Sequence, residues 1–259
     1  MNMRIVGSMT TTPPRIGQIQ PAIESVLRQL MPIDHLELNV PDRSIRTDEP
    51  YVIPDWMPGI ERLQVFRIGQ DLGPISKIAP TLLRYRGDKQ TYLWSVDDDF
   101  AYQPDHLELL CRAHDPSRYR ILTRQGGTIK ADGTVQFLYG TAEVSMFEGF
   151  DGVLYPPDCV GDDFAAYVAA TSANADCRAS DDMVLSLYFR RRGVPIYLDR
   201  PKEAPRILGV RLPYARADAL RLSIGGDWQP IYKRVIDYVA TLNAGFRTET
   251  LPNRLQQGF

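Results

Sequence analysis

Three aspartates stand in a row at positions 97–99, directly behind the apolar run Tyr92–Val96. Adjacent carboxylates repel one another at neutral pH unless a cation or hydrogen-bond donors neutralise them. Oxygen ligands select hard cations such as magnesium or manganese, and magnesium commonly takes one or two protein carboxylates and completes its shell with substrate phosphates. The run therefore predicts a divalent cation bound together with a diphosphate.

The position of this run favours function over a solvated acidic turn. Tyr92–Val96 reads as a buried strand, and ligands of open α/β sheets collect beyond the carboxyl ends of strands. Asp97 and Asp99 are two residues apart, so they face the same way if strand geometry continues. Asp98 then points elsewhere or bonds a sugar hydroxyl.

A second acidic pair, Asp181 and Asp182, follows about eighty residues later at the start of an expected helix. Acids in a first turn interact favourably with the helix dipole without any chemistry. A carboxylate held rigidly at a helix start could also remove a proton from an attacking hydroxyl. The residues alone leave both interpretations open. A third pair, Asp162 and Asp163, is expected to be a polar loop or cap.

Two segments could contact phosphate or nucleotide. The first, Gly7–Arg15, contains hydroxyls, two prolines and an arginine behind the first expected strand, but no Walker or Gly-x-Gly-x-x-Gly pattern. The second, Gly73–Lys77, opens an expected helix, where backbone N–H groups and a lysine would suit phosphate. A surface lysine on an amphipathic helix is the competing interpretation of Lys77.

The elements that position these residues alternate between strands and helices in the first third of the chain. Short apolar runs predict strands and helical patterns lie between them, which is typical of βαβ units and a parallel sheet. The expected order is strand Arg4–Gly7, helix Pro21–Leu30, strand His35–Val40, strand Leu63–Ile68, helix Ile75–Arg84 and strand Tyr92–Val96.

The pattern then becomes mixed. Antiparallel strands are expected at Arg120–Thr123 and Val135–Tyr139, with turns at Gly126-Gly127 and at Lys130–Gly133. A helix from Ser180 to Arg192, a strand at Val194–Leu198 and a last helix at Gln229–Leu242 complete the prediction. Residues beyond the last helix are expected to be loose.

Composition excludes several protein classes. A chain of 259 residues with 44% apolar residues is long enough for a full core, so residues 1–259 are interpreted as one domain. The formal net charge of -2 provides no general field for nucleic acid. No apolar run is long enough to span a bilayer and no signal-peptide core is present, so we expect a cytoplasmic protein and leave peripheral membrane contact open. Cys111, Cys159 and Cys177 are expected to be buried and unpaired.

Four stretches, in this order and spacing, resemble the inverting GT-A glycosyltransferases of the family 2 type, especially small bacterial and viral hexosyl- or rhamnosyltransferase domains. They are Ser8–Ile16, Asp71–Lys77, Val96–Asp99 and Ser180–Leu185. The resemblance implies a GT-A fold, which is an α/β architecture with a Rossmann-like mixed sheet flanked by helices. It also implies transfer of a sugar, as in polysaccharide biosynthesis, from a nucleotide-diphosphate donor such as a UDP- or dTDP-sugar to a hydroxyl of a glycan or related acceptor.

The resemblance further implies where the donor nucleotide lies. Thr10, Thr11 and Arg15 would lie by the nucleotide, Asp42 after the second strand would face the base, and Lys77 would lie near the base or the diphosphate. The segment Asn39–Asp42 departs from the family, which usually has paired acids there.

The family's D-x-D motif corresponds to Asp97–Asp99. Asp97 and Asp98 would contact the donor, and Asp99, followed by Asp97, would ligate Mn²⁺ or Mg²⁺. The family's acidic pair corresponds to Asp181 and Asp182, with Asp182 as the base that accepts the acceptor proton.

Two alternatives remain open at the level of the sequence. An Asp-x-Asp after an apolar strand is also similar to the haloacid-dehalogenase-type phosphatases, in which Asp97 would be a phosphoryl nucleophile. About ninety residues precede the motif, which counts against that class. The other alternative is a non-catalytic protein that binds a sugar nucleotide.

Overall fold

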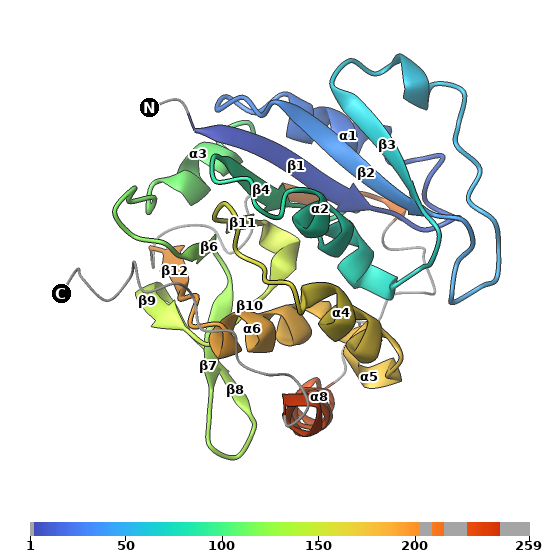
Figure 1. Cartoon of the computed structure of the whole chain (residues 1–259). Coiled ribbons are helices and arrows are strands. Elements are labelled where there is room, and N and C mark those ends of the chain that lie inside the picture. Colours follow the sequence, from blue (N-terminus) through green and yellow to red (C-terminus); the bar gives the residue numbers. More distant parts are fainter. Residues whose placement is uncertain (1–2, 202–208, 215–226, 244–259) are drawn as a thin grey trace.

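A mixed eight-stranded sheet forms the centre of the protein in the computed structural model, which describes residues 3–201, 209–214 and 227–243 (Figure 1). The strand order is β3-β2-β1-β4-β11-β6-β12-β9. The first four strands in this order are mutually parallel, β6 and β12 are parallel to each other, and β11 runs antiparallel between β4 and β6. The strands are β1 (Arg4–Thr10), β2 (His35–Pro41), β3 (Leu63–Ile68), β4 (Thr91–Ser95), β6 (Ile121–Thr123), β9 (Gly140–Val144), β11 (Val153–Tyr155) and β12 (Ile196–Arg200).

Helices cover both faces of this sheet. One face carries α1 (Gln20–Leu27) and α3 (His106–Cys111). The other face is covered by α2 (Ala79–Arg84), α4 (Phe164–Ser172), α5 (Ala175–Ala179), α6 (Asp181–Arg191) and α8 (Gln229–Asn243). In the described part of the chain, three short 3-10 helices lie in the connections: η1 (Met57–Gly59), η2 (Gly73–Lys77) and η3 (Gly149–Asp151). The layers are therefore helix, sheet and helix.

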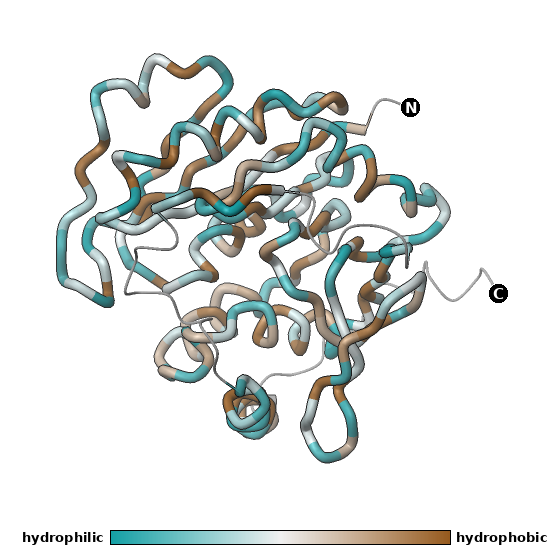
Figure 2. Tube along the Cα trace, turned by 180° about the vertical axis from the view of Figure 1, so that it is seen from behind, coloured by the Kyte–Doolittle hydropathy of each residue, from teal (hydrophilic) through white to brown (hydrophobic). Residues whose placement is uncertain are grey.

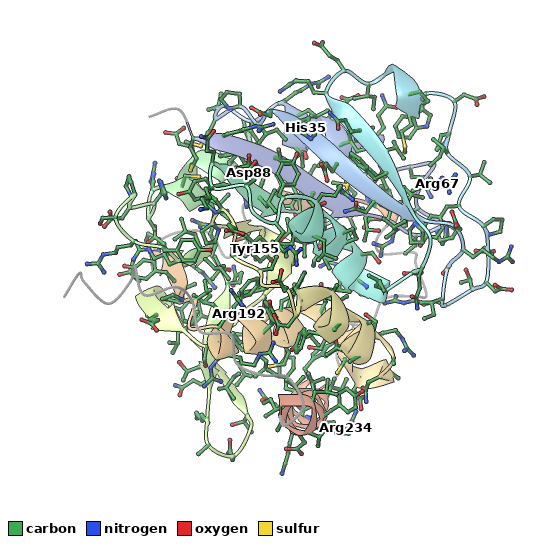
Figure 3. The ribbon with its side chains drawn as sticks, in the orientation of Figure 1. His35, Arg67, Asp88, Tyr155, Arg192 and Arg234 are labelled. Carbon is green, nitrogen blue, oxygen red and sulfur yellow. The ribbon has the colours of Figure 1, made fainter. Side chains whose placement is uncertain are left out.

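Alternation along the strands gives each face its own hydrophobic core. Ile5 and Trp94 belong to the core under α1 and α3, whereas their neighbours Val6 and Leu93 belong to the core under the other helices. Tyr155 at the end of β11 is fully buried and lies between the sheet and α6 (Figure 3). Successive side chains of a strand point to opposite faces, so a sheet buried on both sides needs nearly continuous apolar runs.

Two small antiparallel sheets flank the main one. Strands β10 (Met146–Phe147), β7 (Gly126–Ile129) and β8 (Val135–Phe137) form one, and β13 (Gly209–Arg211) pairs with β5 (Phe100–Tyr102) to form the other. Helix α8 is fastened to β8, because the Gln229 side chain accepts a hydrogen bond from Val135 N at 2.7 Å and donates one to Val135 O at 3.1 Å. Seen from behind, α8 carries both hydrophobic and hydrophilic residues (Figure 2), as an amphipathic covering helix requires.

The fold class predicted from the sequence is confirmed: a Rossmann-like mixed sheet is flanked by helices. The strand expected at Leu63–Ile68 has those bounds in the structure, and the strand expected at Tyr92–Val96 is β4, one residue earlier at each end. The helix expected at Gln229–Leu242 is α8, which ends one residue later. The three cysteines are buried and free, as predicted. Residues after 243 lie outside the described ranges.

Two local predictions are wrong. The helix expected at Ile75–Arg84 is divided into η2 and α2, because Ile78 between them leaves the helical conformation. Gly126 and Gly127 open strand β7 and do not form a turn. A side chain at either glycine would collide with backbone, since a Cβ would lie 2.6 Å from Met146 O and 2.5 Å from Gln136 O respectively.

Within the described ranges, no helix is both long enough and apolar enough to span a membrane. The Asp162–Asp163 segment forms the expected polar loop. Asp162 pairs with Arg86 at the surface, and Asp163 accepts a hydrogen bond from the Tyr188 hydroxyl at 2.9 Å. Neither aspartate lines the large cleft described below.

Candidate active site in an acidic cleft

A cleft of about 840 Å³ opens beyond the carboxyl ends of β1 to β4. This is where ligands of open α/β sheets commonly lie. The segments after these four strands all contribute to its wall, and the start of α6 and the small sheets close the other side. Its lining includes Thr10–Thr12 after β1, Ser44 and Arg46 after β2, Asp71 after β3, Val96–Asp99 after β4 and Ala179–Asp182 at the start of α6.

Asp98 is the buried anchor of the acidic run. Its carboxylate accepts hydrogen bonds from Thr11 Oγ1 and from Arg15 Nη1, each at 2.7 Å. Burial raises the pKa of Asp98, while Arg15 and Thr11 oppose that rise. The contact ties the loop after β1 to the loop after β4, so Asp98 organises the cleft floor.

Asp99 faces a different set of partners. Its Oδ2 lies 3.4 Å from Arg211 Nη1 and 3.7 Å from Arg15 Nη1. Residues 209–214 pass over this turn, because Leu212 N donates to Asp99 O at 2.9 Å and the Tyr214 hydroxyl donates to Asp98 O. Burial, together with the charges of Asp97 and Asp98, raises the pKa of Asp99 to about 6. A carboxylate held at this cost is one that a cation would stabilise.

Lys77 joins the first acidic run to the second acidic pair. Its Nζ donates to Asp97 Oδ1 at 3.1 Å and lies 3.2 Å from Asp181 Oδ2 and 3.8 Å from Asp182 Oδ1. Burial acts to lower the pKa of Lys77, but the three carboxylates outweigh burial and hold it well above its usual value. The ammonium therefore stays charged and sits between the two acidic groups.

Asp182 is held by backbone as well as by charge. Gly149 N donates to its Oδ2 at 2.9 Å, which leaves Oδ1 turned toward Lys77. Burial and the neighbouring Asp181 raise the pKa of Asp182 well above the usual value, against the effects of Lys77 and the Gly149 N–H. A Cβ at position 149 would lie 2.7 Å from Asp182 Oδ1, so a side chain there would displace the Asp182 carboxylate.

The centre of the cleft has an excess of negative charge. Five carboxylates face three cationic side chains, so full ionisation leaves a formal excess of two negative charges among Asp97, Asp98, Asp99, Asp181, Asp182, Arg15, Lys77 and Arg211. One divalent cation would balance that excess. Among the described residues that line the cleft none is His or Cys, and oxygen donors alone suit magnesium or manganese.

No group of three or more His, Cys, Asp or Glu side chains is arranged as a complete metal site in the described part of the chain. A magnesium site that uses one or two carboxylates and substrate phosphates does not require such a group. Asp99 and Asp97 therefore fit a cation that arrives with a diphosphate better than one bound by protein alone.

Part of the cleft wall is aromatic and also carries polar side chains. Phe137, Phe150 and Trp228 line it together with Met146, Tyr232, Glu148, Asp227 and Gln229. Trp228 stacks on Tyr232 with ring centroids 6.3 Å apart. Burial raises the pKa of Tyr232, and the charges of Glu148 and Asp182 raise it further. The aromatic part of the wall therefore lies near Asp182.

Most of the residues singled out in the sequence meet in this cleft, with some differences in orientation. Thr10, Thr11, Arg15, Lys77 and the acidic residues 97–99 and 181–182 all line it. The Thr10 hydroxyl donates to Asn39 O at 2.8 Å, and Lys77 is neutralised by carboxylates.

Two expectations about aspartates are not met. Asp42 is exposed and does not line the cleft. The expected common orientation of Asp97 and Asp99 is wrong, because β4 ends at Ser95 and the following turn directs the two carboxylates to different cations. Strand alternation therefore does not apply to them.

Two residues that contact the acidic run were not singled out in the sequence. Arg211, which lines the cleft, and Tyr214 reach the run from 112 and 116 residues away, and no local pattern marks them. Asp71, which opens the stretch Asp71–Lys77 of the family resemblance, also lines the cleft. Its two carboxylate oxygens accept from Gly73 N at 2.8 Å and Ile45 N at 2.9 Å, which joins the loops after β2 and β3.

Comparison with known proteins provides no family assignment. The sequence matches no family model and no curated protein. Among solved structures, the chain is similar to 4-diphosphocytidyl-2C-methyl-D-erythritol synthase, with 10% identity and a TM-score of 0.46 over 84% of this chain and 96% of that chain. A likeness at this level says nothing about ligand or reaction, so function is inferred from the residues of the cleft.

Proposed function

We propose that the protein is an inverting glycosyltransferase that moves a sugar from a nucleoside-diphosphate donor to a hydroxyl acceptor with the help of a divalent cation. The observation that carries the proposal is the convergence of two separate acidic groups, Asp97–Asp99 and Asp181–Asp182, in one cleft beyond the strand ends. One group suits a cation with a diphosphate, and the other suits proton removal from an attacking hydroxyl.

The donor would bind along the strand ends. Asp99 and Asp97 would hold Mn²⁺ or Mg²⁺, and when bound the cation would offset the negative charge that develops on the departing diphosphate. Arg15, which already contacts Asp98 and Asp99, would keep those carboxylates oriented. The nucleoside would occupy the end lined by Thr11 and Tyr51, where UDP and dTDP are the first donors to test.

Asp182 would act as the general base. The acceptor oxygen attacks the anomeric carbon, its proton passes to the Asp182 carboxylate, and the bond from carbon to the diphosphate oxygen breaks with its electron pair on the diphosphate. Gly149 N–H donates to Oδ2, and Oδ1 lies buried 3.8 Å from Lys77 Nζ, so the carboxylate is held in one orientation at the cleft wall. A raised pKa makes Asp182 a stronger proton acceptor once it is ionised. Attack from the face opposite the diphosphate inverts the anomeric configuration.

The acceptor would bind at the aromatic part of the wall. Phe137, Phe150 and Trp228 offer flat apolar surfaces, and the Glu148 carboxylate offers acceptor oxygens for hydroxyl groups. A sugar ring has an apolar face and hydroxyl edges, so it matches this lining. The acidic groups at this part of the wall oppose a polyanionic acceptor and favour a neutral glycan.

The test is incubation of the protein with Mn²⁺ and a panel of nucleotide sugars, followed by detection of the released nucleoside diphosphate. Slow donor hydrolysis without acceptor, accelerated by a glycan acceptor, is expected. Asp182→Asn should still bind the donor but lose the acceleration. Release of nucleoside monophosphate and sugar 1-phosphate would contradict the proposal.

Two other outcomes separate the rival functions. Trapping of a phosphoaspartate at Asp97 would identify a phosphatase. Tight donor binding without any turnover would identify a sugar-nucleotide binder.

A further inference from the structure

One buried tyrosine connects the turn that carries Asp97 with the turn whose Gly149 N–H binds Asp182. Tyr102 lies in β5, three residues after the acidic run, and is 5% exposed. Its hydroxyl accepts a hydrogen bond from Asp97 N at 2.9 Å and donates one to Phe150 O at 3.1 Å. Both hydrogen-bonding roles of the hydroxyl are therefore used on backbone groups of two separate cleft segments.

Phe150 belongs to the Gly149–Asp151 turn, which also holds Asp182. Gly149 N–H binds Asp182 Oδ2, and the Phe150 ring lines the cleft. The far end of the turn is fixed by His106, whose Nε2 donates to Asp151 O at 2.8 Å. Gly152, which follows the turn, has a φ of 78° and leaves no room for a Cβ, since that atom would lie 2.6 Å from Trp94 Nε1. The turn is thus held in one conformation from several sides.

The Tyr102 ring is itself firmly packed. It meets His106 edge-on at 4.8 Å and Trp94 at 5.8 Å between ring centroids. Burial raises the pKa of Tyr102 well above its usual value, so the hydroxyl keeps the proton that it donates to Phe150 O. Tyr102 does not line the cleft and so does not contact a bound substrate.

We infer that Tyr102 is a positioning residue that sets the separation between the Asp97–Asp99 turn and Asp182 by binding both the Asp97 N–H and the Gly149–Asp151 turn. The inference rests on the proposed function for its kinetic consequence, because that separation matters where the diphosphate and the base must act on one sugar. Small displacements of catalytic groups lower the rate even when binding is retained.

The decisive variant is Tyr102→Phe, which keeps the ring and removes the hydroxyl. Tyr119→Phe is the matched control, because the Tyr119 hydroxyl also donates to a backbone carbonyl, Pro157 O at 2.9 Å, away from the cleft lining. Amide hydrogen exchange at Asp97 and Gly149 should become about tenfold faster in Tyr102→Phe and remain unchanged in Tyr119→Phe. Thermal unfolding verifies that each variant is folded.

The kinetic arm measures turnover and binding separately. In Tyr102→Phe, kcat for sugar transfer should fall about tenfold, while the Kd for Mn²⁺ with the nucleoside diphosphate stays within about twofold of wild type. A purely structural role would instead lower the fraction of binding-competent protein and leave kcat per binding site unchanged. Gly149→Ala tests the other end of the same connection, since its Cβ would meet Asp182 Oδ1. This variant should also show a lower kcat with a nearly unchanged Kd for Mn²⁺ and the nucleoside diphosphate.

Wild-type exchange rates at Asp97 and Gly149 in Tyr102→Phe, or full kcat in both folded variants, would overturn the inference. If Tyr102→Phe does not fold, Gly149→Ala decides, and full kcat in that variant overturns it. If wild type turns over no donor at all, the proposed function fails, and the exchange rates alone then confirm or overturn the connection.

Discussion

Replacing Asp99 by asparagine should stabilise the metal-free protein and at the same time remove its cation-dependent ligand binding. The Asp99 side chain is 11% exposed and lies close to the carboxylates of Asp97 and Asp98. The nearest cationic atoms, Arg211 Nη1 and Arg15 Nη1, are 3.4 Å and 3.7 Å from its Oδ2. Burial and like charge disfavour its ionised form, and asparagine keeps the shape without the charge.

The magnitude follows from the pKa of Asp99, which rises from 3.8 to about 6 on folding. A rise of this size corresponds to about 3 kcal/mol. Between pH 4 and 6 the folded protein binds a proton that the unfolded chain has released, so the free energy of unfolding falls as the pH rises. The destabilisation of the folded protein by the Asp99 carboxylate is fully present above pH 6 and absent below about pH 4. Asp99→Asn should therefore gain up to about 3 kcal/mol at pH 8 and little at pH 4.

Chemical denaturation at pH 4 and pH 8 measures both values. Asp162→Asn is the control, because the Asp162 side chain is 79% exposed and lies outside the cleft lining, and its effect should stay within about 0.5 kcal/mol. Addition of Mn²⁺ with a nucleoside diphosphate should then stabilise wild type and fail to stabilise Asp99→Asn. Destabilisation of Asp99→Asn at pH 8, or a gain that is equal at both pH values, would refute the reasoning.

Three further substitutions have distinct expected outcomes. Asp182→Asn should reduce transfer by roughly 10²- to 10⁴-fold with donor binding retained, and calorimetry beside a turnover assay would expose a wrong base if transfer persisted. Lys77→Met leaves three carboxylates without their shared ammonium and should lower the free energy of unfolding by about 3–5 kcal/mol. Lys130→Met is the control, because Lys130 is exposed and its loss should have almost no effect. Equal denaturation midpoints for the two variants would contradict this expectation. Trp228→Ala should raise the KM for a glycan acceptor by up to about tenfold and the KM for donor much less, and steady-state kinetics showing the reverse order would place the acceptor elsewhere.

The first half of the fold could be predicted because β1, β2 and β4 are largely buried and short β-rich runs mark them. Tyr92–Val96 is such a run, and the acidic run stands where β4 ends. The small strands β5, β10 and β13 were not predicted, since two or three residues are too few to show a period. Their pairing depends on contacts between segments far apart in the sequence.

The same limit applies to the site. Asp97–Asp99 and Asp181–Asp182 could be found because each is a dense local cluster, but their joining by Lys77 is a tertiary contact that only the structure reveals. Asp42 was expected by analogy with the paired acids of the family, and the chain after Pro41 instead carries it to the surface. Position after a strand therefore indicated the right edge of the sheet without indicating which side chains point into the cleft.

The central claim is that the acidic cleft binds a nucleoside diphosphate through a divalent cation. Isothermal titration calorimetry of the full chain with UDP, dTDP and their sugar conjugates, with and without Mn²⁺, tests it most directly. We predict binding of at least one of these nucleotides that requires the metal and is lost in Asp99→Asn. Binding that is equally tight without metal, or no binding of any nucleotide in its presence, would contradict the claim.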